Sequence, residues 1–232
     1  MGGNVINVPR TGQQIVAVGS RGSGKTELQC CLVNLAPAER KFIIDTQDSL
    51  EADFAGFKKI TTPQALSWKM KMFKKIRYVP KNEYRNRATW NYVLDTIANS
   101  SSKSKPRPID LYIDEIYHLG IGMSFPTSLP ILCSTARQKR IGIYISTQRP
   151  SLIPISVLSE ATKIYVFYLS YLEDLKKVGK FSKIGDLPLR LREMELDHAF
   201  VEVDGQSGTY RIMPPLNLKS VKERINANSR RN

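Results

Sequence analysis

The feature that most constrains this chain is a glycine-rich segment of eight residues, Gly19–Thr26, with the sequence GSRGSGKT. The segment fits the pattern GxxxxGK(S/T) and directly follows an apolar run, Gln14–Val18. In residues 27–35, which come next, leucine and cysteine side chains recur at helical spacing. This order of strand, loop and helix is the context in which the pattern forms a phosphate-binding loop, and it predicts an α/β domain.

The composition of the loop suits the oxygens of a nucleoside triphosphate. Glycines let backbone N–H groups and a helix N-terminus approach these anionic oxygens closely. Lys25 is predicted to reach the β and γ phosphates, and the hydroxyl of Thr26 to ligate Mg²⁺. A chance glycine-rich turn that ends in a surface lysine is the alternative, which the flanking strand and helix disfavour. The predicted nucleotide contacts are Gly19, Ser20, Arg21, Gly22, Ser23, Gly24, Lys25 and Thr26.

Length and charge bound the remaining possibilities. The 232 residues suffice for one large domain, predicted at residues 1–213, with a basic tail at residues 214–232. Lys and Arg outnumber Asp and Glu by 35 to 21, a net charge of +14 that indicates a polyanionic partner or an anionic membrane surface. No run approaches the roughly 18 apolar residues of a membrane span. The start also lacks the layout of a signal peptide, so we expect an intracellular protein.

A basic stretch at residues 58–87 carries ten Lys and Arg side chains and one acid, Glu83. Aromatic residues such as Trp68 and Tyr84 are threaded through it. Cations contact phosphates and flat rings stack on bases, so the stretch is a candidate nucleic-acid surface. A solvated helix face with ordinary core aromatics fits the same pattern equally well. The polar segment 99–108 adds three more cations, and a charged helix is expected just before the stretch, near residues 48–56.

Two carboxylates close a second apolar run, Ile109–Ile113. In a phosphate-loop fold, the acid that ends a neighbouring parallel strand faces the phosphate site and holds magnesium through water. Asp114 fits this role, and Glu115 is then placed to polarise a water for attack on the γ phosphate. Acids also end many strands at protein surfaces, but the complete loop upstream favours the functional interpretation.

A third strand is predicted at Ile141–Thr147, directly before Gln148. Ligands of open α/β sheets lie beyond the carboxyl ends of the strands, so we expect Gln148 close to the nucleotide. There it would hydrogen-bond the γ phosphate or the attacking water, although a polar residue at a strand exit explains it as well. The helix before this strand ends in a basic cluster that includes Arg137 and Arg140.

The remaining elements complete the predicted sheet. Further strands are expected at residues 41–45 and 163–169. A capping box that starts at Ser170 predicts that a helix begins there. Two final strands, 198–203 and 208–213, flank a turn and predict a hairpin. The three cysteines show no CxxC spacing and are interpreted as core thiols. His118 and His198 are isolated in the sequence and are interpreted as structural.

Together these motifs give the chain a resemblance to the FtsK/HerA superfamily of DNA-translocating ATPases. The most specific part is Arg140-Ile141-Gly142 leading into Ser146–Pro150, followed by Ser156–Ser159 and a strand. The resemblance covers roughly residues 13–213, but not the basic stretch. Within the superfamily, the chain looks like a genome-packaging ATPase of a tailless, membrane-containing icosahedral virus. It lacks the membrane span of the chromosome translocases, and too few residues precede the loop for the barrel of the HerA branch.

The resemblance implies a RecA-like P-loop NTPase with a mostly parallel central sheet flanked by helices and a C-terminal β-hairpin. The strand that leads to Gln148 would lie between the phosphate-loop strand and the Asp114 strand. The chain would hydrolyse ATP with Mg²⁺ at the subunit junctions of a ring, commonly a hexamer, around double-stranded DNA. An arginine of the neighbouring subunit would complete each site. Arg140 or Arg137 is the candidate, and Arg149 a weaker third.

The implied function is packaging of a viral genome into a capsid. Capsid or virion vertex proteins would be further partners, and the protein would act in the host cytoplasm or in the virion. Three alternatives remain open at this point. The chain could be a repair or conjugation motor of the same superfamily, a P-loop kinase of a small molecule, or a nucleotide-dependent assembly protein that binds acidic coat proteins.

Overall fold

The computed structural model describes residues 7–120, 124–182 and 198–216. The strands are β1 (Gln14–Val18), β2 (Arg40–Asp45), β3 (Lys58–Ile60), β4 (Lys75–Tyr78), β5 (Ile109–Asp114), β6 (Ile141–Thr147), β7 (Lys163–Val166), β8 (Phe200–Asp204) and β9 (Tyr210–Met213). The α-helices are α1 (Lys25–Leu35), α2 (Leu66–Met72), α3 (Arg87–Asn99), α4 (Ser128–Thr135), α5 (Ile155–Ser159) and α6 (Leu172–Ser182). Short 3-10 turns include η3 (Ile116–Leu119), directly after β5.

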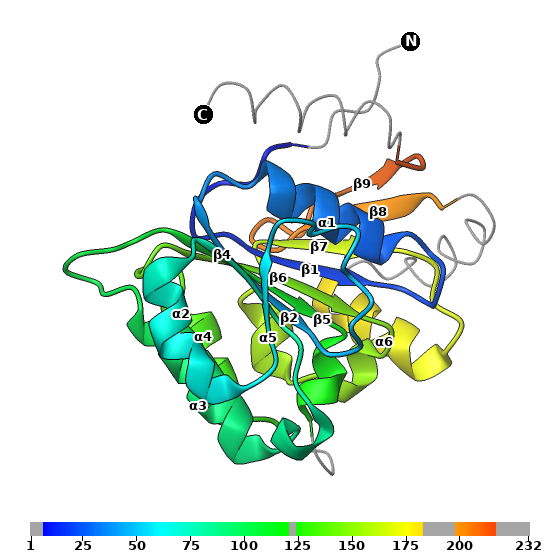
Figure 1. Cartoon of the computed structure of the whole chain (residues 1–232). Helices are drawn as coiled ribbons and strands as arrows, with labels where there is room; N and C mark the ends of the chain where they lie inside the picture. Colours follow the sequence, from blue (N-terminus) through cyan, green and yellow to red (C-terminus); the bar gives the residue numbers. More distant parts are fainter. Residues whose placement is uncertain (1–6, 121–123, 183–197, 217–232) are drawn as a thin grey trace.

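The strands form one nine-stranded sheet in the order β3-β4-β2-β5-β6-β1-β7-β8-β9 (Figure 1). The seven strands from β3 to β7 in this order are parallel, whereas β8 and β9 add an antiparallel hairpin. The predicted α/β fold with a mostly parallel sheet and a C-terminal hairpin is therefore confirmed. The strand order predicted for the centre is also confirmed, because β6 pairs with β1 on one side and β5 on the other.

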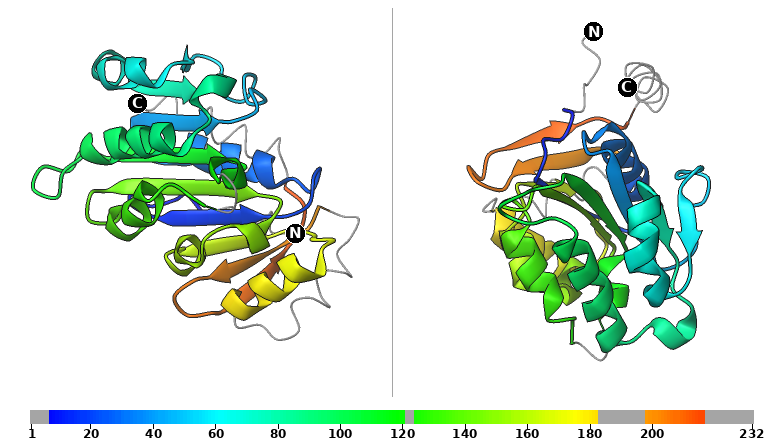
Figure 2. Two further views of the ribbon diagram at one scale, coloured as in Figure 1. Left: turned by 90° about the horizontal axis from the view of Figure 1, so that it is seen from below. Right: turned by 60° about the vertical axis from the view of Figure 1, so that its left-hand side comes forward.

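Helices cover both faces of the sheet, with α1 on one face and α2 to α6 on the other (Figures 1 and 2). Side chains alternate along β1 between two apolar cores. Val16 and Val18 pack in the larger core with the helices of the second face, while Ile15 and Ala17 pack in the smaller core with α1. Both faces of the central strands are buried, which explains why these strands read as continuous apolar runs.

The parallel arrangement brings three chain segments together at the carboxyl ends of the central strands. The phosphate loop follows β1, Glu115 follows β5, and Gln148 follows β6. Because the carboxyl ends of parallel strands meet at one edge, these segments are neighbours although they lie far apart in the sequence.

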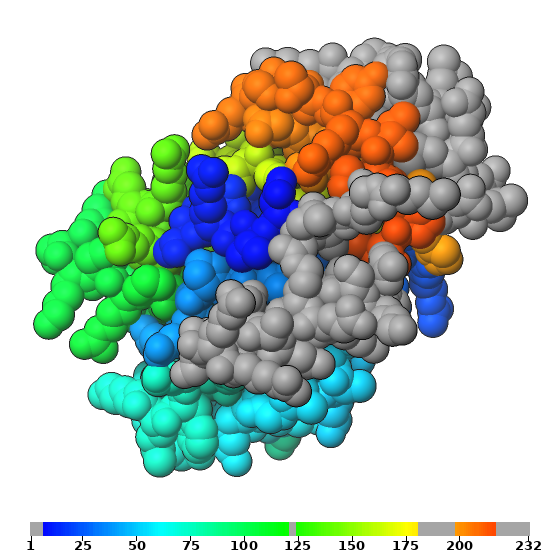
Figure 3. Space-filling view, turned by 90° about the horizontal axis from the view of Figure 1, so that it is seen from above, coloured from blue at the N-terminus to red at the C-terminus, as the bar shows by residue number. Residues whose placement is uncertain are grey.

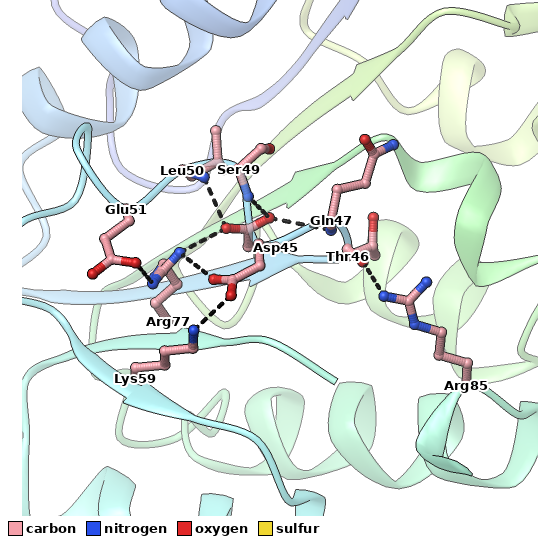
Figure 4. A network of polar contacts seen from close by, with 10 residues as sticks. Asp45, Thr46, Gln47, Ser49, Leu50, Glu51, Lys59, Arg77 and Arg85 are labelled. Carbon is pink, nitrogen blue, oxygen red and sulfur yellow. Dashed lines mark hydrogen bonds and ion pairs between the residues drawn. The ribbon is translucent and has the colours of Figure 1, made fainter. Parts of the chain in front are cut away.

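The expected helix near residues 48–56 is wrong, because turns occupy most of this segment. The carboxylate of Asp45 at the end of β2 accepts hydrogen bonds from the backbone N–H groups of Gln47, Ser49 and Leu50, at 3.3, 3.1 and 3.0 Å (Figure 4). A side chain that captures local backbone donors competes with the helical hydrogen bonds of the same residues.

The buried guanidinium of Arg77 in β4 holds this turn segment in place. It donates to Asp45 at 2.9 Å and to Asp48 at 3.0 Å, and it pairs with Glu51 at 3.4 Å (Figure 4). Arg85 donates to the carbonyl of Thr46 in the same segment. The turn segment is thus anchored to the basic stretch through tertiary contacts that no local pattern encodes.

Replacement of Arg77 by methionine is expected to lower the free energy of unfolding by about 3 kcal/mol, because it leaves the fully buried Asp45 without its cation. Urea denaturation followed by circular dichroism measures the change. The control is Lys176→Met, which removes an exposed ion pair with Glu173 and should cost less than about 0.5 kcal/mol. Equal losses in the two variants would show that the Arg77 ion pairs do not stabilise the fold.

Three smaller expectations concern the cysteines, a membrane-spanning helix and the C-terminal tail. Cys30, Cys31 and Cys133 are all buried, in keeping with core positions. Among the described residues, no helix is both long and apolar enough to span a bilayer. The predicted basic tail lies outside the described residues, apart from residues 214–216.

Candidate nucleotide-binding site

The phosphate loop forms a tight turn between β1 and α1, and two of its glycines adopt left-handed backbone angles. Gly22 has φ +76° and Gly24 has φ +94°, a region that residues with a side chain rarely adopt. At Gly19, a β-carbon would lie 2.6 Å from the Ser23 hydroxyl and 2.7 Å from Cβ of Phe167. These positions therefore require glycine, and the loop closes onto the N-terminus of α1, where backbone N–H groups bind anions.

Neighbouring strands hold the loop from both sides. The backbone N–H of Gly19 donates to the carbonyl of Thr147 at 3.2 Å, and that of Ser20 donates to the carbonyl of Tyr168 at 2.8 Å. These contacts connect the loop directly to the end of β6 and to the segment that follows β7.

Asp114 lies at the end of β5, almost fully buried at 3% exposure. Its Oδ1 accepts hydrogen bonds from the hydroxyls of Tyr112 at 2.8 Å and Ser146 at 2.6 Å. Burial raises the pKa of Asp114 above its ordinary value, and the two hydrogen bonds oppose this shift without cancelling it. The two hydroxyls fix the orientation of the carboxylate.

Glu115 connects the loop, β5 and β6 through its two carboxylate oxygens. Its Oε1 lies 3.0 Å from Nζ of Lys25 and accepts from the Gln148 amide at 2.8 Å. Its Oε2 accepts from the backbone N–H of Gln148 at 3.0 Å. The structure therefore brings together three side chains that the sequence assigned to chemistry from three separate motifs.

The backbone at Glu115 is left-handed, with φ 47° and ψ 62°. This conformation costs a residue with a side chain roughly 1–2 kcal/mol. The N–H of Glu115 donates to the Ser146 hydroxyl at 3.0 Å, which holds the turn. Strain at a buried carboxylate that contacts the lysine of a phosphate loop is typical of a functional site.

Thr26 and Asp114 offer the kind of ligands that magnesium prefers in nucleotide sites. Mg²⁺ is commonly held by one or two protein oxygens together with substrate phosphates. Among the described residues, no group of three or more His, Cys, Asp or Glu side chains is placed to hold a metal without such help. A hydroxyl and a single carboxylate beside a phosphate loop therefore fit an ion that arrives with its nucleotide.

Arg137 and Arg140 lie at the opposite end of β6 from Gln148. The turn before β6 includes Arg140 at φ 54°, and the carbonyl of Arg140 accepts from the N–H of Ile109 at the start of β5. Arg137 lines a cavity of about 600 Å³ beside Arg10 and Gln206. In Figure 3, the blue residues before β1 lie between the orange hairpin and green residues of the chain. Neither arginine reaches the phosphate loop of its own chain.

Arg149 is held by contacts within its own chain. Its Nε donates to the buried carboxylate of Asp174 at 3.1 Å, and its guanidinium lies 4.4 Å from the centre of the Tyr171 ring. Both contacts come from the region of α6, so the end of β6 is attached to that helix. An arginine engaged in this way is a poor candidate for action on a neighbouring subunit.

A cavity of about 500 Å³ opens beside the phosphate loop. Residues 22–27 line it together with Phe167, His198, Pro215 and Leu216. Its volume and its mixture of polar backbone, ring and apolar side chains are typical of a small-ligand pocket. The sequence analysis interpreted His198 as structural, because only the fold brings the start of the hairpin to the loop.

Tyr112 and Ser146 are site residues that the sequence analysis missed. Tyr112 precedes Asp114 by two positions, so alternation along a strand places both on one face, and this signal was available in principle. Ser146 lies on a different strand, and its contact with Asp114 depends on the pairing of β5 with β6. No local pattern could have identified it.

No protein-family model and no curated protein matches the sequence. Several solved structures do match the fold. The genome packaging NTPase B204 from Sulfolobus turreted icosahedral virus 2, in complex with ATP-gammaS, matches with a TM-score of 0.70 at 18% identity, over 88% of this chain and 98% of that one. B204 from Sulfolobus turreted icosahedral virus, described as a DNA-packaging ATPase, gives a TM-score of 0.69 at 20% identity, over 89% and 99%.

A more distant match is EssC (ATPases 2 and 3) from Geobacillus thermodenitrificans, with a TM-score of 0.60 at 14% identity. It covers 95% of this chain and 45% of that one. Sequence identities this low establish similarity of the fold alone. The fold that the resemblance implied is confirmed: the chain shares the P-loop NTPase fold of these structures.

Proposed function

We propose that the protein is an ATPase that moves double-stranded DNA, and that it serves the packaging of a viral genome. The observation that carries the proposal is the contact of Glu115 with both Lys25 and Gln148 at 3.0 and 2.8 Å. It joins the lysine of a phosphate loop to a candidate base and to a candidate sensor at the end of a neighbouring strand.

Each side chain has a distinct task in this proposal. Lys25 neutralises charge on the β and γ phosphates, which is the main way in which proteins promote phosphoryl transfer. Glu115 orients the attacking water and accepts its proton. Gln148 hydrogen-bonds the γ phosphate or the attacking water. When the γ phosphate leaves, this hydrogen bond is lost, and the change is passed on through β6. Mg²⁺, held by Thr26 and Asp114 with the phosphates, would neutralise further charge on the triphosphate.

The position of the two arginines supports assembly as a ring. Arg137 and Arg140 lie at the end of β6 away from the site of their own chain, where they can face the site of a neighbour. The proposed ring, a hexamer, would place ATP at its subunit junctions. Capsid or virion vertex proteins are the proposed further partners.

Charge and similarity together support duplex DNA as the cargo. The net charge of +14 favours a polyanion. Two proteins of the same fold are described as a genome packaging NTPase and a DNA-packaging ATPase. Recognition through phosphates would be independent of sequence, as the transport of a whole genome requires.

Glu115→Gln is the variant that tests this function. We expect ATP binding to persist and ATP turnover to fall at least about a hundredfold, because the amide cannot accept the proton of the attacking water. Equilibrium binding of a fluorescent ATP analogue and steady-state phosphate release measure the two effects, with and without duplex DNA. Glu173→Gln, a change at an exposed position of α6, is the matched control.

In the wild-type protein, duplex DNA should increase phosphate release. Full turnover in the Glu115→Gln variant would contradict the assignment of the base. Transfer of the γ phosphate to a nucleoside or sugar, with no effect of DNA, would instead show that the protein is a kinase.

A further inference from the structure

A groove of about 1130 Å³ lies near the amino ends of the strands, whereas the nucleotide site lies at their carboxyl ends. Its walls come from α2, α3, the start of β2 and the loop that leads from α3 into β5. In Figure 1 this loop projects at the left of the molecule, whereas the phosphate loop lies at the right, between β1 and α1. The groove is therefore separate from the candidate site for ATP.

Cations from three separate segments converge on this groove. Its lining includes Arg40, Lys71, Lys74, Lys105 and Arg107. The acids that line it are Glu39 and Asp95, of which Glu39 pairs with Lys74 at 2.6 Å. Within the described part of the chain, the other four cations form no ion pair. The groove therefore carries an excess of positive charge that the protein leaves unbalanced.

Arg40 and Arg107 are close enough to repel each other. Burial lowers the pKa of Arg40, and the charge of Arg107 lowers it further. Arg40 is half-buried and donates to the carbonyl of Ser100 at 3.3 Å, which fixes its position at the base of the projecting loop. Two like charges held together without a counter-ion favour an anion from outside.

Three other cations of the basic stretch are already bound to groups of the protein and do not contribute to such a surface. Arg77 is buried among acids, Lys59 pairs with Asp48 at 2.6 Å, and Arg85 donates to a backbone carbonyl. Trp90 and Tyr78 pack edge to face in the core, with ring centres 6.2 Å apart. Within the stretch, Arg77, Lys59 and Arg85 thus have partners elsewhere, whereas Lys71 and Lys74 line the groove.

The groove also presents exposed apolar side chains. Tyr92 on α3 is 44% exposed and Met72 on α2 is 65% exposed. Both line the groove beside its cations. Cations near apolar groups suit a sugar–phosphate strand, because phosphates meet the charges while deoxyribose rings contact the apolar atoms.

We propose that this groove holds the phosphate backbone of duplex DNA, away from the ATP site of its own chain. The inference rests on the proposed function, which supplies duplex DNA as the partner, and it names the surface that contacts the partner. The contact involves no base edges, so it gives affinity without preference for a sequence.

The test is a triple variant, Lys71→Gln, Lys105→Gln and Arg107→Gln, compared with a matched triple variant of exposed lysines outside the groove, Lys81→Gln, Lys176→Gln and Lys180→Gln. Both remove three positive charges. Fluorescence anisotropy with a labelled duplex of about 30 base pairs, measured from about 50 to 200 mM salt, gives the slope of log affinity against log salt. The slope is negative, and each lost phosphate contact reduces its magnitude by about 0.9. We therefore expect the magnitude of the slope to be smaller by about 2.7 in the groove variant than in the wild type. The matched variant should lose less than about 1.

Equal slopes for the two variants, with wild-type binding intact, would overturn the groove assignment and leave the proposed function standing. Absence of DNA binding in the wild-type protein would overturn the proposed partner itself. If polyglutamate binding depends on the groove cations while DNA binding does not, the groove serves an acidic protein and the inference is wrong. Basal ATP hydrolysis and the urea midpoint should match those of the wild type, which verifies that the variants fold.

Discussion

ATP hydrolysis by the Lys25→Ala variant is expected to fall at least about a thousandfold, to the background of the assay. Lys25 is only 4% exposed, and a buried, fixed cation stabilises developing charge far more than one at a surface. Its loss removes charge neutralisation from the phosphates and leaves Glu115 without its cation. Phosphate release at saturating ATP measures the effect.

The control for this variant is Lys180→Ala, a change at an exposed lysine of α6. It should leave turnover within about twofold of the wild type, since surface charges far from a site contribute little. Circular dichroism establishes that the Lys25→Ala protein is folded. Ordinary turnover by this variant would end the assignment of Gly19–Thr26 as the site of hydrolysis.

The second large effect concerns an arginine supplied between subunits. Arg140→Ala is expected to reduce hydrolysis on the order of a thousandfold, which is typical for the loss of an arginine that acts on the transferred phosphate. A mixture of Arg140→Ala and Lys25→Ala subunits should recover part of the activity. In such a mixture, some junctions combine an intact phosphate loop from one variant with an intact arginine from the other.

The geometry determines which arginines to compare in this mixing experiment. Arg137→Ala is the direct rival of Arg140→Ala, because both residues lie at the same end of β6. Arg149→Ala should show no rescue, since its guanidinium binds Asp174 within the same subunit. No recovery at any mixing ratio, for either Arg137 or Arg140, would indicate a site that one chain completes alone.

The parts of the fold that follow short patterns could be predicted from the sequence. The loop at Gly19–Thr26 has strict steric requirements, and the central strands are apolar because both of their faces are buried. Parallel strands then bring Glu115 and Gln148 to the loop, so the positions of these two residues followed from the fold class. The fold class does not specify the three-way contact at Glu115, which also depends on the left-handed turn at that residue and on the Ser146 hydroxyl that holds it.

Contacts between distant segments could not be predicted in the same way. The segment near residues 48–56 has enough charge for an exposed helix, but Asp45 captures its backbone donors and Arg77 fixes the turn. For a similar reason, the sequence alone favoured neither a nucleic-acid surface nor a solvated helix face for the basic stretch at residues 58–87. Whether a lysine is solvated, paired or part of a groove depends on partners such as Arg40 and Arg107, which lie outside the stretch.

The two outer strands of the sheet have a consequence for how copies of the protein associate. An exposed strand edge is a template for pairing with another chain, and short strands with lysine side chains oppose such pairing. β3 has only three residues, of which Lys58 and Lys59 are exposed, and β9 has four, with Arg211 exposed. Continuous β-sheet between neighbouring molecules is therefore disfavoured at both edges. We expect subunits to meet through side-chain surfaces that can separate and rejoin, which is the kind of junction that a cyclic motor requires.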